Sequence, residues 1–161
     1  EFGITKGDKP AWTAEQSYVV LLHASSRDAK LWPEEHWISL ATALFEQHDL
    51  VAVYPWGSSV EQERARRLTV ASPQAVQAPA MSLREASGLL GNASAVVGVD
   101  TGLTHLANAL NVPLVAIYTD TDPASTGVME SPYAINMGGI GQCPSPEQVL
   151  LQLLSRKDFS C

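Results

Sequence analysis

The chain has 161 residues, of which 45% are hydrophobic and 17% are charged, and its formal net charge at pH 7 is −7. This length and composition are typical of one packed domain and argue against a disordered chain. The acidic balance argues against a nucleic-acid-binding protein, which normally has a basic face, and against a broad polybasic contact with a membrane.

Apolar runs of strand length alternate with helix-period segments throughout the chain. The run YVVLLH at residues 18–23 is nearly continuous, which is typical of a buried strand. Residues 33–47 place their apolar side chains on one helical face, with Pro33 suited to a first turn. Further strands are expected at 50–54, 75–78, 95–99, 112–118 and 133–137, and further helices at 59–70, 83–90, 103–110 and 146–154.

Serines mark the starts of three of these helices. Ser58 or Ser59 is suited to cap the helix at 59–70, and Ser82 has the spacing of a capping box with Glu85. Ser145 precedes a proline, which is common at a first helical position.

The alternation predicts an α/β fold, a Rossmann-like parallel sheet with helices on both faces. We expect this domain at residues 18–155, after a linker or cloning-derived segment at 1–17 and before a tail at 156–161. Ligands bind such sheets at the carboxyl ends of the strands. The loops expected there are 24–32, 55–59, 79–82, 100–105 and 119–127.

The loop DTGLTH at residues 100–105 gives the strongest local signal. Gly102 allows a close backbone approach, and the unpaired first-turn N–H groups of the following helix form a ready anion site. Thr101, Thr104 and His105 add side-chain donors. The alternative is that Asp100 or Thr101 only caps the helix and that His105 packs inside.

The loop after the first strand offers Ser25, Ser26, Arg27 and Lys30. Hydroxyls and a mobile point charge suit a diphosphate, although an ordinary solvated loop has the same composition. Because both loops lie at one edge of the predicted sheet, they favour a shared phosphate site.

Two further residues have weaker signals. Glu61 could hold a ribose diol through its carboxylate, or only compensate the dipole of its own helix. Met81 could contact a base, or only fill a gap in the core.

No metal site is expected. Asp120 and Asp122 have the D-x-D spacing of metal-dependent glycosyltransferases, but Asp122 precedes a proline and suits a helix cap. The histidines His23, His36 and His48 show no ligand spacing with each other or with the cysteines.

Three segments, residues 21–37, 54–68 and 96–127, resemble the C-terminal half of the lipopolysaccharide core heptosyltransferases, glycosyltransferases of family 9. The motif DTGLTHLA is specific to this superfamily, and the run RDAKLWPEEHW narrows the similarity to the heptosyltransferase I type. The resemblance extends over residues 18–154.

The resemblance implies a two-domain GT-B enzyme that inverts the anomeric centre. The N-terminal domain would bind Kdo-lipid A and supply an aspartate base, and this domain would bind ADP-L-glycero-D-manno-heptose without a cofactor. It also implies a role for each candidate residue. Ser25, Ser26 and Lys30 would contact the diphosphate, and Lys30 would stabilise the leaving group. Glu61 would hold the ribose, and Met81 would lie beside the adenine. The phosphates and the heptose would be lined by Asp100, Thr101, Gly102, Leu103 and His105.

The chain departs from the family in three respects. It is about half as long as a full enzyme, so we expect this part alone to transfer no sugar. Ser25 and Ser26 stand where threonines are commoner, and Thr119-Asp120 stand where Gly-Pro is frequent. Two alternatives stay open: a non-catalytic nucleotide-binding module, and a heptosyltransferase of type II or III.

The expected location is the cytoplasm, with peripheral association of the full enzyme at the inner membrane. No apolar run reaches the ~18 residues needed to span a bilayer, and no signal peptide is visible. Two cysteines are too few for a disulfide framework, which favours a reducing compartment.

Overall fold

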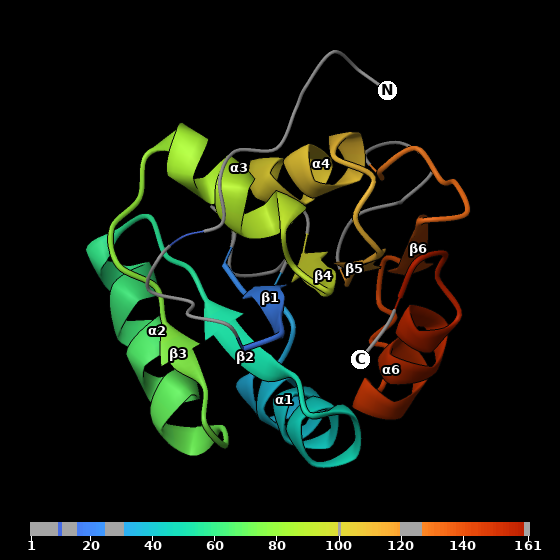
Figure 1. Cartoon of the computed structure of the whole chain (residues 1–161). Coiled ribbons are helices and arrows are strands. Elements are labelled where there is room, and N and C mark those ends of the chain that lie inside the picture. Colours follow the sequence, from blue (N-terminus) through green and yellow to red (C-terminus); the bar gives the residue numbers. More distant parts are fainter. Residues whose placement is uncertain (1–9, 11–15, 25–30, 100, 120–126, 160–161) are drawn as a thin grey trace.

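A computed structural model of the chain describes residues 10, 16–24, 31–99, 101–119 and 127–159. Within these residues, six strands form one parallel sheet in the order β3-β2-β1-β4-β5-β6 (Figure 1). The chain begins at the centre with β1, moves outward to β3, and then crosses back to place β4 beside β1. The strands are β1 (Tyr18–Leu22), β2 (Val51–Tyr54), β3 (Val76–Gln77), β4 (Ala95–Val99), β5 (Leu114–Tyr118) and β6 (Ala134–Gly138).

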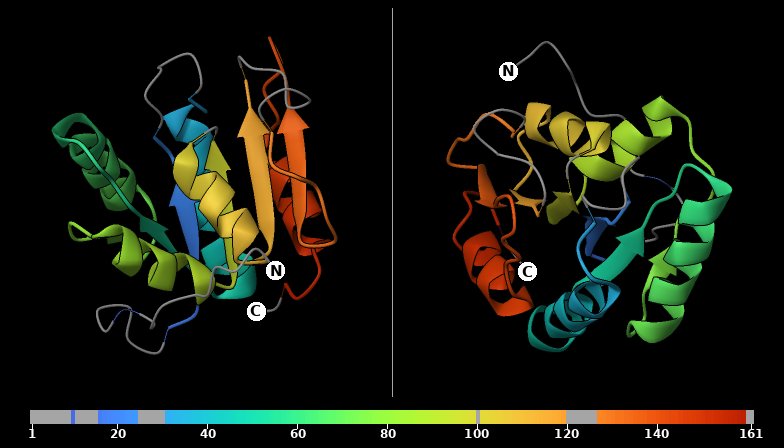
Figure 2. Two further views of the ribbon diagram at one scale, coloured as in Figure 1. Left: turned by 90° about the horizontal axis from the view of Figure 1, so that it is seen from above. Right: turned by 180° about the vertical axis from the view of Figure 1, so that it is seen from behind.

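The central strands are buried along their whole length. Every residue of β1, β2, β4 and β5 is buried, as their continuous apolar sequences predict. The register places Val20 of β1 between Val53 of β2 and Val96 of β4. All strands run in one direction, so their carboxyl ends share one edge of the sheet (Figure 2).

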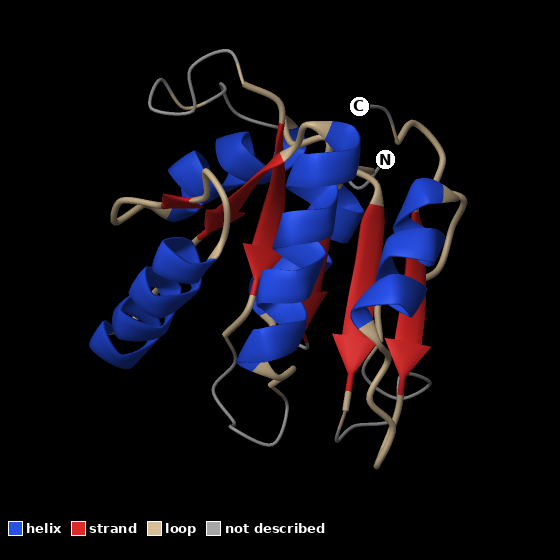
Figure 3. Ribbon diagram, turned by 90° about the horizontal axis from the view of Figure 1, so that it is seen from below, coloured by secondary structure: helices blue, strands red, loops and turns tan. Residues whose placement is uncertain are grey.

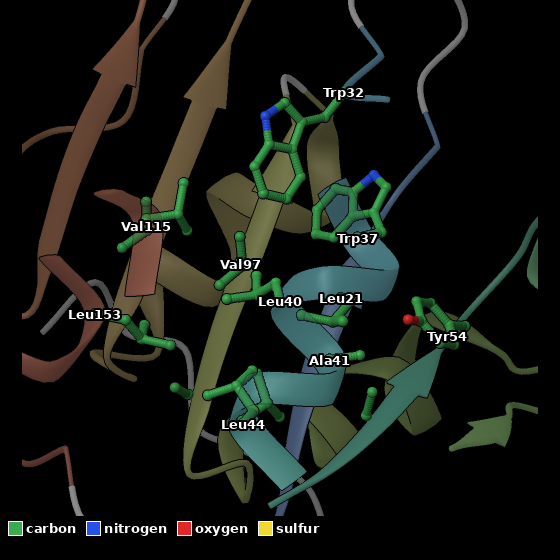
Figure 4. Close-up of a cluster of buried hydrophobic side chains, with 14 of the residues drawn as sticks. Leu21, Trp32, Trp37, Leu40, Ala41, Leu44, Tyr54, Val97, Val115 and Leu153 are labelled. Carbon is green, nitrogen blue, oxygen red and sulfur yellow. The ribbon is translucent and has the colours of Figure 1, made fainter. Parts of the chain in front are cut away.

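Helices cover both faces of the sheet, as predicted (Figure 3). The helices α3 (Leu83–Gly91) and α4 (Gly102–Ala109) lie on one face. The other face is covered by α1 (Glu34–His48), α2 (Ser59–Ala71) and α6 (Pro146–Leu154). Each face therefore has its own apolar core, and the larger one packs Trp37, Leu40 and Leu44 of α1 against the sheet (Figure 4).

The three predicted serine caps are confirmed. The hydroxyl of Ser58 accepts from the N–H of Glu61, and Ser82 and Ser145 each form a complete capping box. Each cap satisfies first-turn donors that have no partner within the helix.

Some boundaries differ by one or two residues from the expected ones. Pro33 is the N-cap of α1 rather than its first residue, and β1 ends at Leu22. Strand β5 begins at Leu114 rather than at 112, because Pro113 has no N–H to donate to a ladder. Beyond α6, Phe159 packs against the core and contacts the His48 ring, so this part of the predicted tail adjoins the domain.

Candidate nucleotide-binding site

The strand order identifies where a ligand would bind. Strands are added on one side of β1 up to β3 and on its other side from β4 onward, and ligands of such sheets bind outside the carboxyl ends of the strands at this switch point. Because β1 and β4 are parallel neighbours, their carboxyl ends lie side by side at the expected site. Four predicted site residues, Ser25, Ser26, Lys30 and Asp100, lie outside the described residues, as do Asp120 and Asp122 of the D-x-D segment.

The start of α4 has the features of an anion site. Thr101 is the N-cap in an extended conformation, and its side chain makes no capping hydrogen bond. Among the described residues, the first turn of α4 holds no acidic side chain to offset the positive partial charge of the helix start. Gly102 is exposed, and a Cβ added to it would meet no atom within 4 Å, so the backbone of this turn is open to an approaching ligand.

A tight contact holds α4 against its strand. Buried Thr104 donates a hydrogen bond of 2.6 Å from its hydroxyl to the carbonyl of Val99. A Cβ on Gly98 would overlap that hydroxyl and lie 3.1 Å from Cβ of Leu22, so only glycine fits here. Gly98 thus lets α4 begin close to the sheet, a role that no local sequence pattern indicates.

The other residues of this turn differ in exposure. His105 is exposed, so the alternative in which it packs inside is wrong. Leu103 is half-buried and packs against the core beneath α3 and α4. The buried polar residue of the turn is Thr104, and its hydroxyl serves the backbone rather than a ligand.

Glu61 lines a pocket of about 380 Å³ at the carboxyl edge of the sheet. The pocket lies between the loop after β1, which contributes Ala24 and Leu31, and the first turns of α2. Oε1 of Glu61 accepts a hydrogen bond of 2.8 Å from the N–H of Gly57. The full lining is Ala24, Leu31, Ser59, Val60, Glu61, Glu63, Arg64 and Arg67.

The loop between β2 and α2 is braced at several points. The Trp56 indole N–H donates to the carbonyl of Ala78 at 2.6 Å, which links this loop to the end of β3. Nε2 of buried His23 lies 2.8 Å from the carbonyl of Pro55, which can only accept a proton. Burial lowers the pKa of His23 to about 4, so the ring is neutral near pH 7 and its proton lies on Nε2.

Met81 follows the Ala78 segment and is half-buried against the smaller core. This contact fits the gap-filling alternative. Its predicted place beside an adenine stays a prediction.

Arg64 joins the starts of α1 and α2. Its guanidinium donates to the carbonyl of Trp32 at 3.0 Å and to the carboxylate of Glu34 at 3.3 Å. Arg67 also binds Glu34, and this hydrogen bond lowers the pKa of the Glu34 carboxyl. These ion pairs span about 30 residues of sequence, so no local pattern could have predicted them.

A thiol and an imidazole meet near the same edge. Sγ of exposed Cys143 lies 3.7 Å from Nδ1 of His36, although 107 residues separate them. The neighbouring carbonyl of Pro144 accepts from the indole of Trp32 at 2.9 Å. In the described ranges, no three His, Cys, Asp or Glu side chains are grouped to hold a metal ion.

None of the helices within the described residues is both long and apolar enough to cross a membrane.

Comparison with known proteins identifies relatives. The family model of glycosyltransferase family 9 (heptosyltransferase) matches residues 4–153. Lipopolysaccharide heptosyltransferase 1 of Escherichia coli K12 is 38% identical over 143 residues, which are 86% of this chain and 41% of the relative. The chain therefore spans about two fifths of that relative's length.

Two solved structures support the same assignment. E. coli heptosyltransferase WaaC with ADP matches at 37% identity with a TM-score of 0.74, over 87% of this chain and 42% of that chain. The same enzyme with ADP-2-deoxy-2-fluoro heptose matches at 34% identity with a TM-score of 0.71, over 88% and 44%.

Proposed function

Because this chain belongs to glycosyltransferase family 9, the heptosyltransferases, we propose that it is the donor-binding domain of an inverting transferase. Its donor would be ADP-L-glycero-D-manno-heptose and its acceptor Kdo-lipid A, in the synthesis of the lipopolysaccharide inner core. One observation carries the proposal: the open first turn of α4 lies at the sheet edge where β1 and β4 end. The relatives solved with ADP and with ADP-2-deoxy-2-fluoro heptose support this choice of nucleotide.

The diphosphate would bind at the start of α4. The N–H groups of Gly102 and Leu103 belong to the first turn, where no intrahelical acceptor is available. Thr101 keeps its hydroxyl free of a capping bond, and exposed His105 lies one turn further on. Asp100, Ser25, Ser26 and Lys30 complete the proposed set from the two adjoining loops.

The nucleoside would extend toward β2 and β3. Glu61 lines the pocket beside the loop after β1, where its carboxylate would accept hydrogen bonds from the ribose hydroxyls. Met81 would lie beside the adenine. The braces of Trp56 and His23 fix the loop that leads to Glu61, so the carboxylate would be positioned before the ligand arrives.

The proposed reaction is a single displacement. An acceptor hydroxyl loses its proton to a base and attacks the anomeric carbon, while the bond from that carbon to the β-phosphate oxygen breaks. The negative charge gained by ADP would be stabilised by Lys30 and the α4 amides. We assign the base to a part of the protein outside this sequence, since the chain matches only 41% of the relative's length.

We also place the full enzyme in the cytoplasm, at the cytoplasmic face of the inner membrane. Its proposed acceptor is a membrane lipid, so peripheral contact would suffice for access.

Calorimetric titration of this chain with ADP, UDP and GDP tests the proposal. We expect binding of ADP and at least tenfold weaker binding of UDP and GDP. Lys30→Ala should weaken ADP binding by roughly 10-fold or more, because a charge-assisted hydrogen bond is lost. No heat and no change in melting temperature with ADP would contradict the proposal.

A further inference from the structure

The Glu61 carboxylate departs from the capping pattern of its neighbours in this chain. Helices α3 and α6 both carry the spacing Ser-x-x-Glu/Gln, and in both the third-position side chain accepts from the N–H of its own N-cap serine at 2.9 Å. Helix α2 has the same spacing in Ser58 and Glu61. There, however, the carboxylate reaches one residue further back and accepts from the N–H of Gly57 at 2.8 Å.

This difference moves the carboxylate out of the ordinary cap position. A capping box serves the helix alone, since both of its hydrogen bonds satisfy first-turn donors. The bond to Gly57 instead ties Glu61 to the loop that follows β2, on the wall of the 380 Å³ pocket. The hydrogen bond of this side chain is therefore made to the loop and not to the cap residue of its own helix.

Only one oxygen of the carboxylate is used. Oε1 is held by Gly57, and among the described residues no hydrogen bond is found to Oε2 of Glu61. The hydrogen bond to Oε1 restricts the side chain of Glu61, and Oε2 keeps its lone pairs for a further hydrogen bond.

Gly57 also supplies the space that this geometry needs. A Cβ at position 57 would lie 3.2 Å from Oε1 of Glu61, closer than an ordinary van der Waals contact. The backbone of Gly57 is not in the left-handed region, so alanine would bring no backbone strain. An added methyl group would therefore act mainly on the carboxylate.

We propose that Gly57 is the positioning residue of the ribose site: its N–H and its missing side chain orient Glu61 so that Oε2 meets a vicinal diol. This inference rests on the proposed nucleotide site. It makes Gly57 a determinant of selectivity for ribonucleotides over 2′-deoxyribonucleotides.

Calorimetric titration with ADP and with 2′-deoxy-ADP tests this inference on the whole chain. We expect the unmodified protein to prefer ADP by roughly 10-fold or more, the value of a hydrogen bond to a charged group. Gly57→Ala should reduce the preference to within about 3-fold, because ADP loses the contacts of both hydroxyls whereas 2′-deoxy-ADP has only its 3′-hydroxyl contact to lose. Glu61→Gln should have the same effect, because its amide oxygen still accepts from Gly57 and only the second acceptor is lost.

Glu85→Gln is the matched control, since it changes the equivalent cap residue of α3. It should keep the full preference for ADP. A mainly structural effect of Gly57→Ala would change the melting temperature and leave the ratio of the two affinities unchanged.

The outcomes separate the two proposals. If the unmodified protein prefers ADP to 2′-deoxy-ADP and Gly57→Ala keeps that preference, the inference about Gly57 is wrong, while the proposed nucleotide site is still supported. Equal binding of both nucleotides by the unmodified protein also overturns the inference alone. If the unmodified protein binds neither nucleotide, the proposed function itself is wrong.

Discussion

The contact between Gly98 and Thr104 allows a sharp test of how α4 is held at the sheet. In Gly98→Ala the added methyl group would overlap the Thr104 hydroxyl and lie 3.1 Å from Cβ of Leu22. Thr104 and Leu22 are both buried, so neither can move into solvent. Overpacking of this kind costs about 1–3 kcal/mol, and loss of the bond from Thr104 to Val99 adds about 0.5–1.5 kcal/mol.

We therefore expect Gly98→Ala to lower the free energy of unfolding by about 2–4 kcal/mol, measured by urea denaturation. ADP binding should weaken as well, because the first turn of α4 is displaced from its strand. Thr104→Ala removes the overlapping hydroxyl, so the double variant should be more stable than the sum of the single changes predicts, by about 1 kcal/mol or more. A change below about 0.5 kcal/mol in Gly98→Ala, or strict additivity in the double variant, would refute this reasoning.

Three further predictions concern the braces around the site. Burial lowers the pKa of His23 from 6.5 to about 4, so the unfolded chain binds a proton at a higher pH than the folded protein does. The free energy of unfolding should therefore fall by up to about 3 kcal/mol as the pH drops from 6.5 to 4, measured by urea denaturation at each pH. His23→Gln should reduce this fall, and an equal fall in the variant would exclude His23 as its cause. Trp56→Phe keeps an aromatic ring but loses the hydrogen bond to the Ala78 carbonyl, which should lower the free energy of unfolding by about 1 kcal/mol. An unchanged free energy of unfolding would show that this hydrogen bond contributes nothing to stability. Arg64→Met should lower the free energy of unfolding by about 2 kcal/mol, because the Trp32 carbonyl loses a charged donor. Arg66→Met, on the exposed side of α2, should leave the stability unchanged, and equal effects of the two variants would refute the role of Arg64.

The sequence predicted the features that depend on local patterns. Continuous apolar runs such as residues 18–23 indicated buried parallel strands, and the spacing of Ser82 and Glu85 indicated a helix start. Strand β5 begins later than expected, because the alternation of apolar residues does not reveal which backbone donors enter a ladder. The parallel sheet with helices on both faces was predicted, but the order of its strands was not, because alternation along the chain does not say which strands become neighbours.

Features that depend on contacts across the fold were not predicted. Gly98 has no local signal, because its need for a hydrogen side chain comes from the packing of Thr104 and Leu22 around it. The sequence does not distinguish Gly57 from an ordinary turn glycine, because its role depends on the hydrogen bond from its N–H to the Glu61 carboxylate. The proximity of His36 and Cys143 was missed, because spacing along the chain says nothing about two groups that are 107 residues apart.

The most direct test of the account is an NMR titration of the ¹⁵N-labelled chain with ADP. If the first turn of α4 binds the diphosphate, the backbone amides of Gly102 and Leu103 should shift strongly and saturably, more than those of the distant α6. AMP should shift them less at the same degree of saturation, because it lacks the β-phosphate. Saturable ADP binding that leaves these two amides unmoved would contradict the account.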